Sequence, residues 1–197
     1  MQKALQHNPG IVTPAQSAFA LDALGVAGLL YLGALTRIPL PFTPTPLTLQ
    51  TLVVLVAPYL LGRNRAFAGI ALYLALGMTT HITGVALFAA ASGVTYGYLV
   101  GFLLAPLLMA RFPRTPAGVA AATTAAAAMI LILGAVWLHF FLGVSWGHAL
   151  ALGAVPFIPG DLLKVAAACA LVRRMRIYNT RSQQADAPPD KPRPSSV

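Results

Sequence analysis

Long apolar runs, separated by short segments that carry nearly all of the charge, occupy residues 19 to 172 of the chain. Only 9% of the 197 residues are charged and 58% are hydrophobic, whereas a soluble globular domain carries about 25% charged residues. A soluble core of this size could not bury so much apolar surface, so the composition places the chain in the membrane class. Because lipid offers no partners to backbone polar groups, these runs are expected to be helices.

The number of runs predicts the architecture. A hydrocarbon core about 30 Å thick needs roughly 20 apolar residues for each helix, and fewer where protein shields the helix. We predict an all-α integral membrane protein with six transmembrane helices, near residues 19–38, 47–61, 66–80, 96–110, 117–142 and 152–172 or 161–172. A polar segment, residues 1–17, precedes this six-helix domain of residues 18–176. The polar, proline-rich residues 177–197 are expected to form a disordered cytoplasmic tail.

The basic residues alternate along the chain and predict its orientation. Lys3 precedes the first run, and further basic residues follow the second, fourth and sixth runs: Arg63, Arg65, Arg111, Arg114, Arg173, Arg174 and Arg176. The positive-inside bias places these segments and both termini in the cytoplasm, so Arg37, Asp161 and Lys164 share the external side. The net charge of +9 therefore indicates membrane orientation and not nucleic-acid binding.

Most chemistry that needs clustered polar residues is excluded. The single cysteine, Cys169, rules out an internal disulfide framework and a cysteine-rich metal site. The histidines have no metal-ligand spacing to one another or to carboxylates. The sequence contains no phosphate-cradling loop and no Ser–His–Asp set, and its four acidic residues are too few for most hydrolytic chemistry. We therefore expect a protein that is not an enzyme and that uses no cofactor or metal.

Two ionisable residues at the head of the last apolar run require an explanation. In PFIPGDLLK, Asp161 and Lys164 are three positions apart and share one face of a helix. Asp161 alone is explained as the N-cap of a helix after the Pro–Gly turn, and the two together as a simple intrahelical ion pair. Ionisable residues within spans are costly, however, and usually face a cavity or a partner. A carboxylate beside an ammonium suits a polar, largely neutral ligand group with donors and acceptors, such as a cyclic urea.

Arg37 begins a proline-rich connector between the first two runs, with prolines at positions 39, 41, 44 and 46. Because proline cannot continue a helix, the connector is expected to be extended and stiff. Two interpretations stay open. Arg37 either snorkels to the external membrane interface, or belongs to a loop that covers an external pocket and lies near an anionic group of a ligand.

Small residues in the first run have the spacing that allows close helix contact. Ala23 and Ala27 are four positions apart, with Gly25 and Gly28 nearby, and residues of this size let two helix backbones approach. Such a surface either packs within this chain or docks on another membrane subunit. The sequence leaves both interpretations open.

Three motifs together resemble the BioY family, the biotin-specific S components of energy-coupling-factor transporters. They are RIPLPFTPTPLTLQTL at residues 37–52, YGYLVGF at 96–102 and GAVPFIPGDLLK at 153–164. The resemblance covers most of residues 18–176. One stretch departs from the family pattern: from Thr79 to Tyr98 most of the usual glycines are missing, with Val94 and Tyr96 in place of a proline and a glycine.

The resemblance implies a subunit of a bacterial inner membrane that captures biotin outside. It further implies delivery inward with a transmembrane coupling subunit and ATPase subunits, although action alone and homo-oligomerisation stay open. By resemblance, Asp161 accepts ureido N–H groups, Lys164 donates to a ligand oxygen, and Arg37 lies near the carboxylate or takes part in loop closure. Aromatic residues would wall the ring system: Tyr73, Tyr98, Phe102 and Trp137. Ala23 and Ala27 would form the docking surface.

Three alternatives stay beside this interpretation. A related S component could take a different vitamin or precursor, because the altered stretch from Thr79 to Tyr98 could reshape the pocket. A membrane enzyme could act on a lipid with Asp161 and Lys164 as acid and base, and it would turn over lipid without binding biotin. A purely structural subunit would show no dependence on any ligand.

Overall fold

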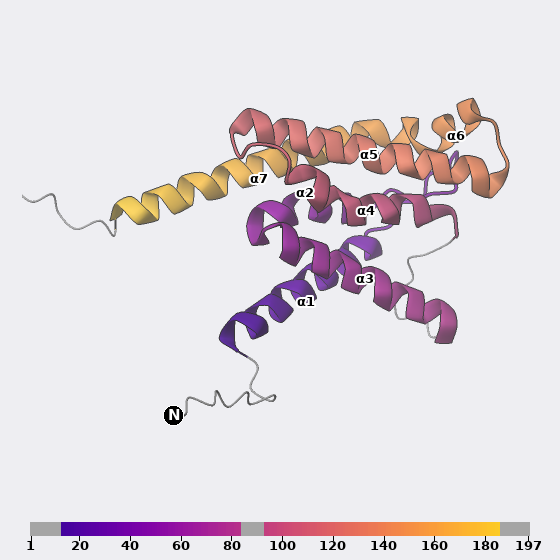
Figure 1. Ribbon diagram of the computed structural model, residues 1–197. Helices are drawn as coiled ribbons and strands as arrows, with labels where there is room; N and C mark the ends of the chain where they lie inside the picture. Colours follow the sequence, from indigo (N-terminus) through magenta and orange to yellow (C-terminus); the bar gives the residue numbers. More distant parts are fainter. Residues whose placement is uncertain (1–12, 84–92, 186–197) are drawn as a thin grey trace, which may run out of the picture.

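The computed structural model describes residues 13–83 and 93–185, and within these ranges the chain forms helices and no strand. The only pairing of extended backbone in these ranges is an isolated antiparallel bridge between Ile38 and Leu47. Figure 1 shows seven labelled α-helices: α1 (Pro14–Leu35), α2 (Gln50–Leu61), α3 (Arg63–Thr83), α4 (Tyr96–Met109), α5 (Pro116–Leu142), α6 (Trp146–Gly153) and α7 (Ile158–Ala185). Short 3₁₀ turns, Gly93–Thr95 and Val155–Phe157, precede α4 and α7.

Local sequence signals account for the start of α1 and for both ends of α5. Thr13 caps α1 in a reciprocal capping box with Gln16, which satisfies two of the backbone N–H groups that a helix start leaves unpaired. Thr115 accepts a hydrogen bond from the backbone N–H of Gly118 and so caps α5. Gly143 ends α5 in the left-handed conformation, with φ of 65°, which glycine adopts without a steric cost.

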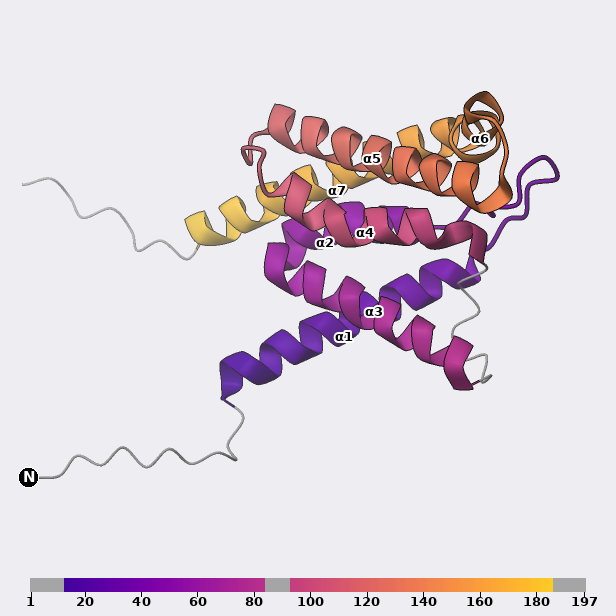
Figure 2. The same cartoon turned by 45° about the vertical axis from the view of Figure 1, so that its right-hand side comes forward.

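Close backbone contact positions α1 across α3, as Figures 1 and 2 both show. Gly69 makes this contact possible, because a Cβ atom there would lie 2.5 Å from the Val26 side chain and 2.8 Å from the Ala23 carbonyl oxygen. On the other side of the molecule α4 lies along α5, and α7 packs against α2 and α5. The rotation of α1 about its own axis is therefore set by its contact with α3.

Apolar side chains cover the outer surface, as in a membrane protein. Leu21, Leu24 and Leu32 of α1 are 68%, 56% and 57% exposed, a degree of exposure that only a lipid environment makes favourable for so many leucines. Among the described residues, three helical stretches are long and apolar enough to cross a membrane: Pro14–Leu35, Pro116–Leu142 and Trp146–Met175. The helices Gln50–Leu61 and Gly93–Met109 are apolar but shorter.

Helix bounds agree with the expected runs in the middle of the chain and differ at both ends. α4 and α5 begin and end within a residue of the prediction. α1 starts at Pro14, inside the segment of residues 1–17 that was expected to precede the helices. α7 starts at Ile158, so Asp161 lies in its first turn and is not an N-cap. α7 also continues to Ala185, so residues 177–185 of the expected tail are helical; residues 186–197 lie outside the described ranges.

The two ends of the helical bundle differ in charge. The start of α1, the turn between α2 and α3, the turn between α4 and α5 and the end of α7 all lie at one end in Figure 1, while α6 and the connector of residues 36–49 lie at the other. The first end holds the basic residues that the alternation of charge grouped together: Arg63, Arg65, Arg111, Arg114, Arg173 and Arg174. Helix connectivity alone produces this grouping, because each pair of consecutive long helices returns the chain to the same end.

Candidate ligand-binding site

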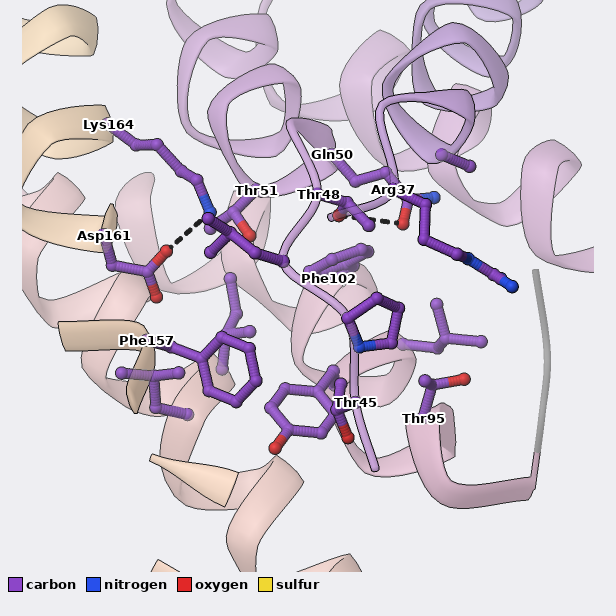
Figure 3. Close-up of a pocket in the computed structure, with 17 residues that line it drawn as sticks. Arg37, Thr45, Thr48, Gln50, Thr51, Thr95, Phe102, Phe157, Asp161 and Lys164 are labelled. Atoms are coloured by element: carbon purple, nitrogen blue, oxygen red, sulfur yellow. Dashed lines mark hydrogen bonds and ion pairs between the residues drawn. The ribbon is translucent and has the colours of Figure 1, made fainter. Parts of the chain in front are cut away.

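A cavity of about 60 Å³ lies where α2, α4, α5 and α7 meet the connector of residues 36–49. Figure 3 shows its lining, which combines charged, amide, hydroxyl and aromatic side chains: Arg37, Thr45, Thr48, Gln50, Thr51, Thr95, Tyr98, Phe102, Phe157, Asp161 and Lys164. Aliphatic side chains of α1, α4, α5 and the connector complete the wall. A few convergent polar groups within an otherwise apolar pocket are the usual composition of a small-molecule site.

Asp161 and Lys164 form an ion pair on the cavity wall. The Lys164 Nζ donates to Asp161 Oδ1 at 2.9 Å, and the two residues are only 6% and 8% exposed. They lie one turn apart at the start of α7, on the same face, as the spacing of three predicts. An ammonium has three donors and a carboxylate two acceptor oxygens, so the pair can still donate and accept hydrogen bonds toward a ligand.

Aromatic side chains form the apolar part of the wall. Tyr98 and Phe157 meet edge to face, with ring centroids 6.1 Å apart. Tyr98 is 8% exposed and its hydroxyl donates to the Gly153 carbonyl oxygen at 2.6 Å, which fixes the ring against the end of α6. Phe102, one turn further along α4, is also buried. These rings offer a flat apolar surface next to the ion pair.

Tyr73 lies behind the cavity wall and does not line the cavity. It is 1% exposed and accepts a hydrogen bond from Gln50 Nε2 at 2.7 Å. The Gln50 Oε1 in turn accepts from the Thr48 hydroxyl at 3.3 Å. Tyr73 was expected to contact the ligand, and the structure instead gives it the position of a residue that orients Gln50 in the wall.

Thr45 carries a buried hydroxyl that interacts with the Tyr98 side chain but makes no hydrogen bond of standard geometry. Its Oγ1 is inaccessible to solvent, and the residue is 6% exposed and lines the cavity. Among the residues that the structure describes, no other buried side-chain nitrogen or oxygen is left in this way. A buried hydroxyl with no partner at all costs roughly 1–3 kcal/mol, and a polar ligand atom beside Thr45 would give it a hydrogen bond of full strength.

The connector reaches over the cavity, with one bridge inside it and one hydrogen bond to α6. Backbone hydrogen bonds of 2.9 Å in each direction join Ile38 and Leu47, and the Thr43 hydroxyl donates to the Leu152 carbonyl oxygen of α6 at 2.7 Å. Arg37 lines the cavity, but Figure 3 shows its guanidinium directed away from Asp161. Arg37 therefore lines the cavity from the connector that covers it, on a different side from the ion pair.

The remaining predicted residues lie elsewhere. Ala23 and Ala27 are 7% and 4% exposed and face into the protein, Ala23 beside α3, which is the internal packing that the sequence left open. Trp137 does not line the cavity, and its Nε1 donates to the Gly93 carbonyl oxygen at 2.6 Å. That bond holds the 3₁₀ turn that ends at Thr95, which does line the cavity. Residues 84–92 of the altered stretch lie outside the described ranges.

Sequence reasoning did not single out Thr45, Gln50, Thr51 or Phe157 as site residues. All four lie within the quoted motifs, and Gln50 and Thr51 are each 7% exposed despite their polarity. A buried glutamine inside an apolar run was a usable signal, because a buried amide needs partners. In the described ranges, no three His, Cys, Asp or Glu residues are placed to hold a metal ion.

Comparison with known proteins gives consistent matches. The model of the BioY family matches residues 7–181. The biotin transporter BioY2 of Lactococcus lactis subsp. cremoris (strain MG1363) is 34% identical over 157 residues, which is 75% of this chain and 83% of that protein. The biotin transporter BioY of Thermotoga maritima is 32% identical over 149 residues, 71% of this chain and 85% of that protein.

A solved structure shares the fold. The crystal structure of the S-component for biotin from an ECF-type ABC transporter superposes with a TM-score of 0.70 and 23% sequence identity. The match covers 84% of this chain and 95% of that one. The helical arrangement in Figure 2 is therefore an arrangement already known from a solved membrane protein.

Proposed function

This chain belongs to the BioY family, and on that premise we propose that it is the membrane subunit that captures biotin at the external face for uptake. The observation that carries the proposal is the buried Asp161–Lys164 pair, which lies on the wall of a cavity in a chain whose relatives are named biotin transporters. A buried ion pair in a membrane helix is costly to keep unless it serves a ligand or a partner.

The chemistry of the cavity suits the vitamin. Biotin has a polar urea ring, an apolar thioether ring and a carboxylate tail. The Asp161 carboxylate accepts ureido N–H groups, and the Lys164 ammonium donates to a ligand oxygen. The thioether ring lies on Tyr98 and Phe102, because aromatic faces supply large apolar contact area. Arg37 lies near the carboxylate or takes part in closing the connector over the bound vitamin.

Binding requires the connector to move. Sites for ligands of drug size enclose about 300–1,000 Å³, and the cavity measures about 60 Å³. The connector of residues 36–49 is the element that can enlarge it, because the Thr43 bond to Leu152 attaches its middle to α6, while the Ile38–Leu47 bridge lies within the connector itself. Opening would break the contact with α6, and closure over the vitamin would restore it.

The membrane arrangement follows from the helices and the charges. We place six spans in a bacterial inner membrane, formed by α1 to α5 and by α7 together with α6, within residues 18–176. The arginine-rich end faces the cytoplasm with both termini. A transmembrane coupling subunit with ATPase subunits delivers the vitamin inward and contacts α1. Ala23 and Ala27 support that contact from inside by holding α1 close to α3.

Calorimetry on the purified, detergent-solubilised protein tests the proposal. Biotin is titrated beside other vitamins, with Asp161→Asn as the site variant and Asp22→Asn as the matched control. Asp22 makes its ion pair with Arg65 on α1 and α3, outside the cavity. We expect binding of biotin that Asp161→Asn weakens more than about tenfold and Asp22→Asn leaves unchanged. Tighter binding of another vitamin would make that vitamin the ligand of the site. Absence of binding to every vitamin tested would refute the proposal.

A further inference from the structure

A second cleft lies at the arginine-rich end, between the turn that joins α2 to α3 and the turn that joins α4 to α5. It encloses about 100 Å³ and is lined by Tyr59, Arg63 and Arg114, with Pro58, Pro106 and Met109 among its apolar residues. Tyr59 lies nine residues after Gln50 on α2, which is roughly 14 Å along the helix. None of the residues that line this cleft lines the cavity beside Asp161.

Two arginines line this cleft, and no carboxylate lines it. Both aspartates of the described ranges are engaged in ion pairs elsewhere, Asp22 with Arg65 and Asp161 with Lys164. The Arg63 Nε donates to the Asn64 side-chain oxygen at 3.1 Å, a neutral acceptor that leaves the positive charge uncompensated. The local potential of the cleft is therefore positive, and an anion is the ligand class that it favours.

We propose that this cleft binds the phosphate group of an anionic phospholipid. A guanidinium presents paired N–H donors that match phosphate oxygens, and the Tyr59 hydroxyl can add a further donor. The cleft lies at the ends of α2 and α4, the level at which helices meet the headgroup layer. Proline, methionine and phenylalanine side chains in its wall fit the glycerol and the first methylene groups, which free phosphate lacks.

The bound lipid would join the two turns that enclose the cleft. Arg63 belongs to the start of α3 and Arg114 to the turn before α5. One phosphate that contacts both arginines therefore links the helix pair α2–α3 to the helix pair α4–α5. The inference is independent of the vitamin, because Arg63 and Arg114 take no part in the cavity near Asp161. Biotin affinity is therefore expected to stay unchanged when the cleft is altered.

Titration of phosphatidylglycerol into the full chain in neutral detergent, read by native mass spectrometry, tests the proposal. The variant is Arg63→Gln/Arg114→Gln. The matched control is Arg173→Gln/Arg174→Gln, which removes the same charge from α7 by exposed residues that do not line the cleft. We expect saturable binding in the wild type, about fivefold weaker for each arginine removed and about 30-fold weaker for both. The control pair should bind as the wild type does.

Four outcomes would overturn the proposal. An equal loss of lipid affinity in the control variant would mean that the lipid is attracted by the overall positive charge and not by the cleft. Phosphatidylcholine binding as tightly as phosphatidylglycerol would mean that the cleft is an apolar groove without preference for an anion. Inorganic phosphate that competes at equal concentration would make the cleft a site for free anions. Absence of saturable binding in the wild type would mean that the cleft does not bind lipid and would favour an acidic segment of a partner protein as its ligand. Size-exclusion and melting profiles establish that each variant is folded, and Tyr59→Phe supplies a second test if the double variant is not.

Discussion

Replacing Lys164 by methionine leaves the Asp161 carboxylate buried without its cation. The two groups are 2.9 Å apart and their side chains are at most 9% exposed, so water cannot compensate for the missing partner. Breaking a buried pair from one side costs about 3–5 kcal/mol of folding stability. Asp161→Asn should cost a similar amount, because it leaves the ammonium of Lys164 unpaired.

The double variant Asp161→Asn/Lys164→Met separates stability from binding. With no buried charge left, most of the lost stability should return, because replacing a whole buried pair by neutral groups is often neutral or stabilising. Biotin binding should not return, since the ligand loses hydrogen bonds to charged groups that are worth about 1.5–3 kcal/mol each. That loss corresponds to about 10- to 150-fold in the dissociation constant for each bond.

Thermal unfolding in detergent and calorimetry with biotin measure the two quantities on the same four proteins: the wild type, both single variants and the double variant. The expected pattern is low stability in the single variants, recovered stability in the double variant and weak binding in all three. A double variant that binds biotin as tightly as the wild type would show that the pair serves structure alone. Single variants as stable as the wild type would show that the pair is not buried.

Two further substitutions test the wall of the cavity. Tyr73→Phe leaves the buried amide of Gln50 without an acceptor, which should cost about 1–3 kcal/mol and weaken biotin binding several-fold in calorimetry; unchanged affinity would remove Tyr73 from any positioning role. Gly134→Ala places a Cβ atom against the Tyr98 ring, so it should lower biotin affinity and also lower the unfolding free energy by about 1–3 kcal/mol. The control Gly25→Ala meets no atom within 4 Å and should lower neither quantity. Equal effects of the two substitutions would contradict the packing around Tyr98.

The agreement in the middle of the chain has a simple cause. Between residues 96 and 142 the helices begin at proline, glycine and threonine signals and end near glycine or charged turns, so local rules place α4 and α5 within a residue. At the last helix the same rules failed. The Pro–Gly turn before Asp161 suggested that the helix begins at the aspartate, yet α7 begins at Ile158 because proline is readily accepted in the first turn of a helix.

Side-chain direction was the harder problem. Helices that are apolar on every side carry no stripe to show which face points inward, so the aromatic residues of α3 and α4 could not be told apart by pattern. Tyr98 lines the cavity, and Tyr73 lies one layer behind it. The different positions of the two tyrosines arise from the rotation of α3 about its own axis. That rotation is set by the close contact that Gly69 allows between α3 and α1.

By itself the sequence determined that this chain is a membrane protein, that it is helical, and that Asp161 and Lys164 share one face of a helix. Composition, the length of the apolar runs and the spacing of three are local properties, and no packing can alter them. Only the tertiary structure decided that Gln50 and the buried hydroxyl of Thr45 line the same cavity as that pair. The connector and α7 are more than a hundred residues apart in the chain, and the contacts that bring them together depend on the fitted shapes of all the helices between them.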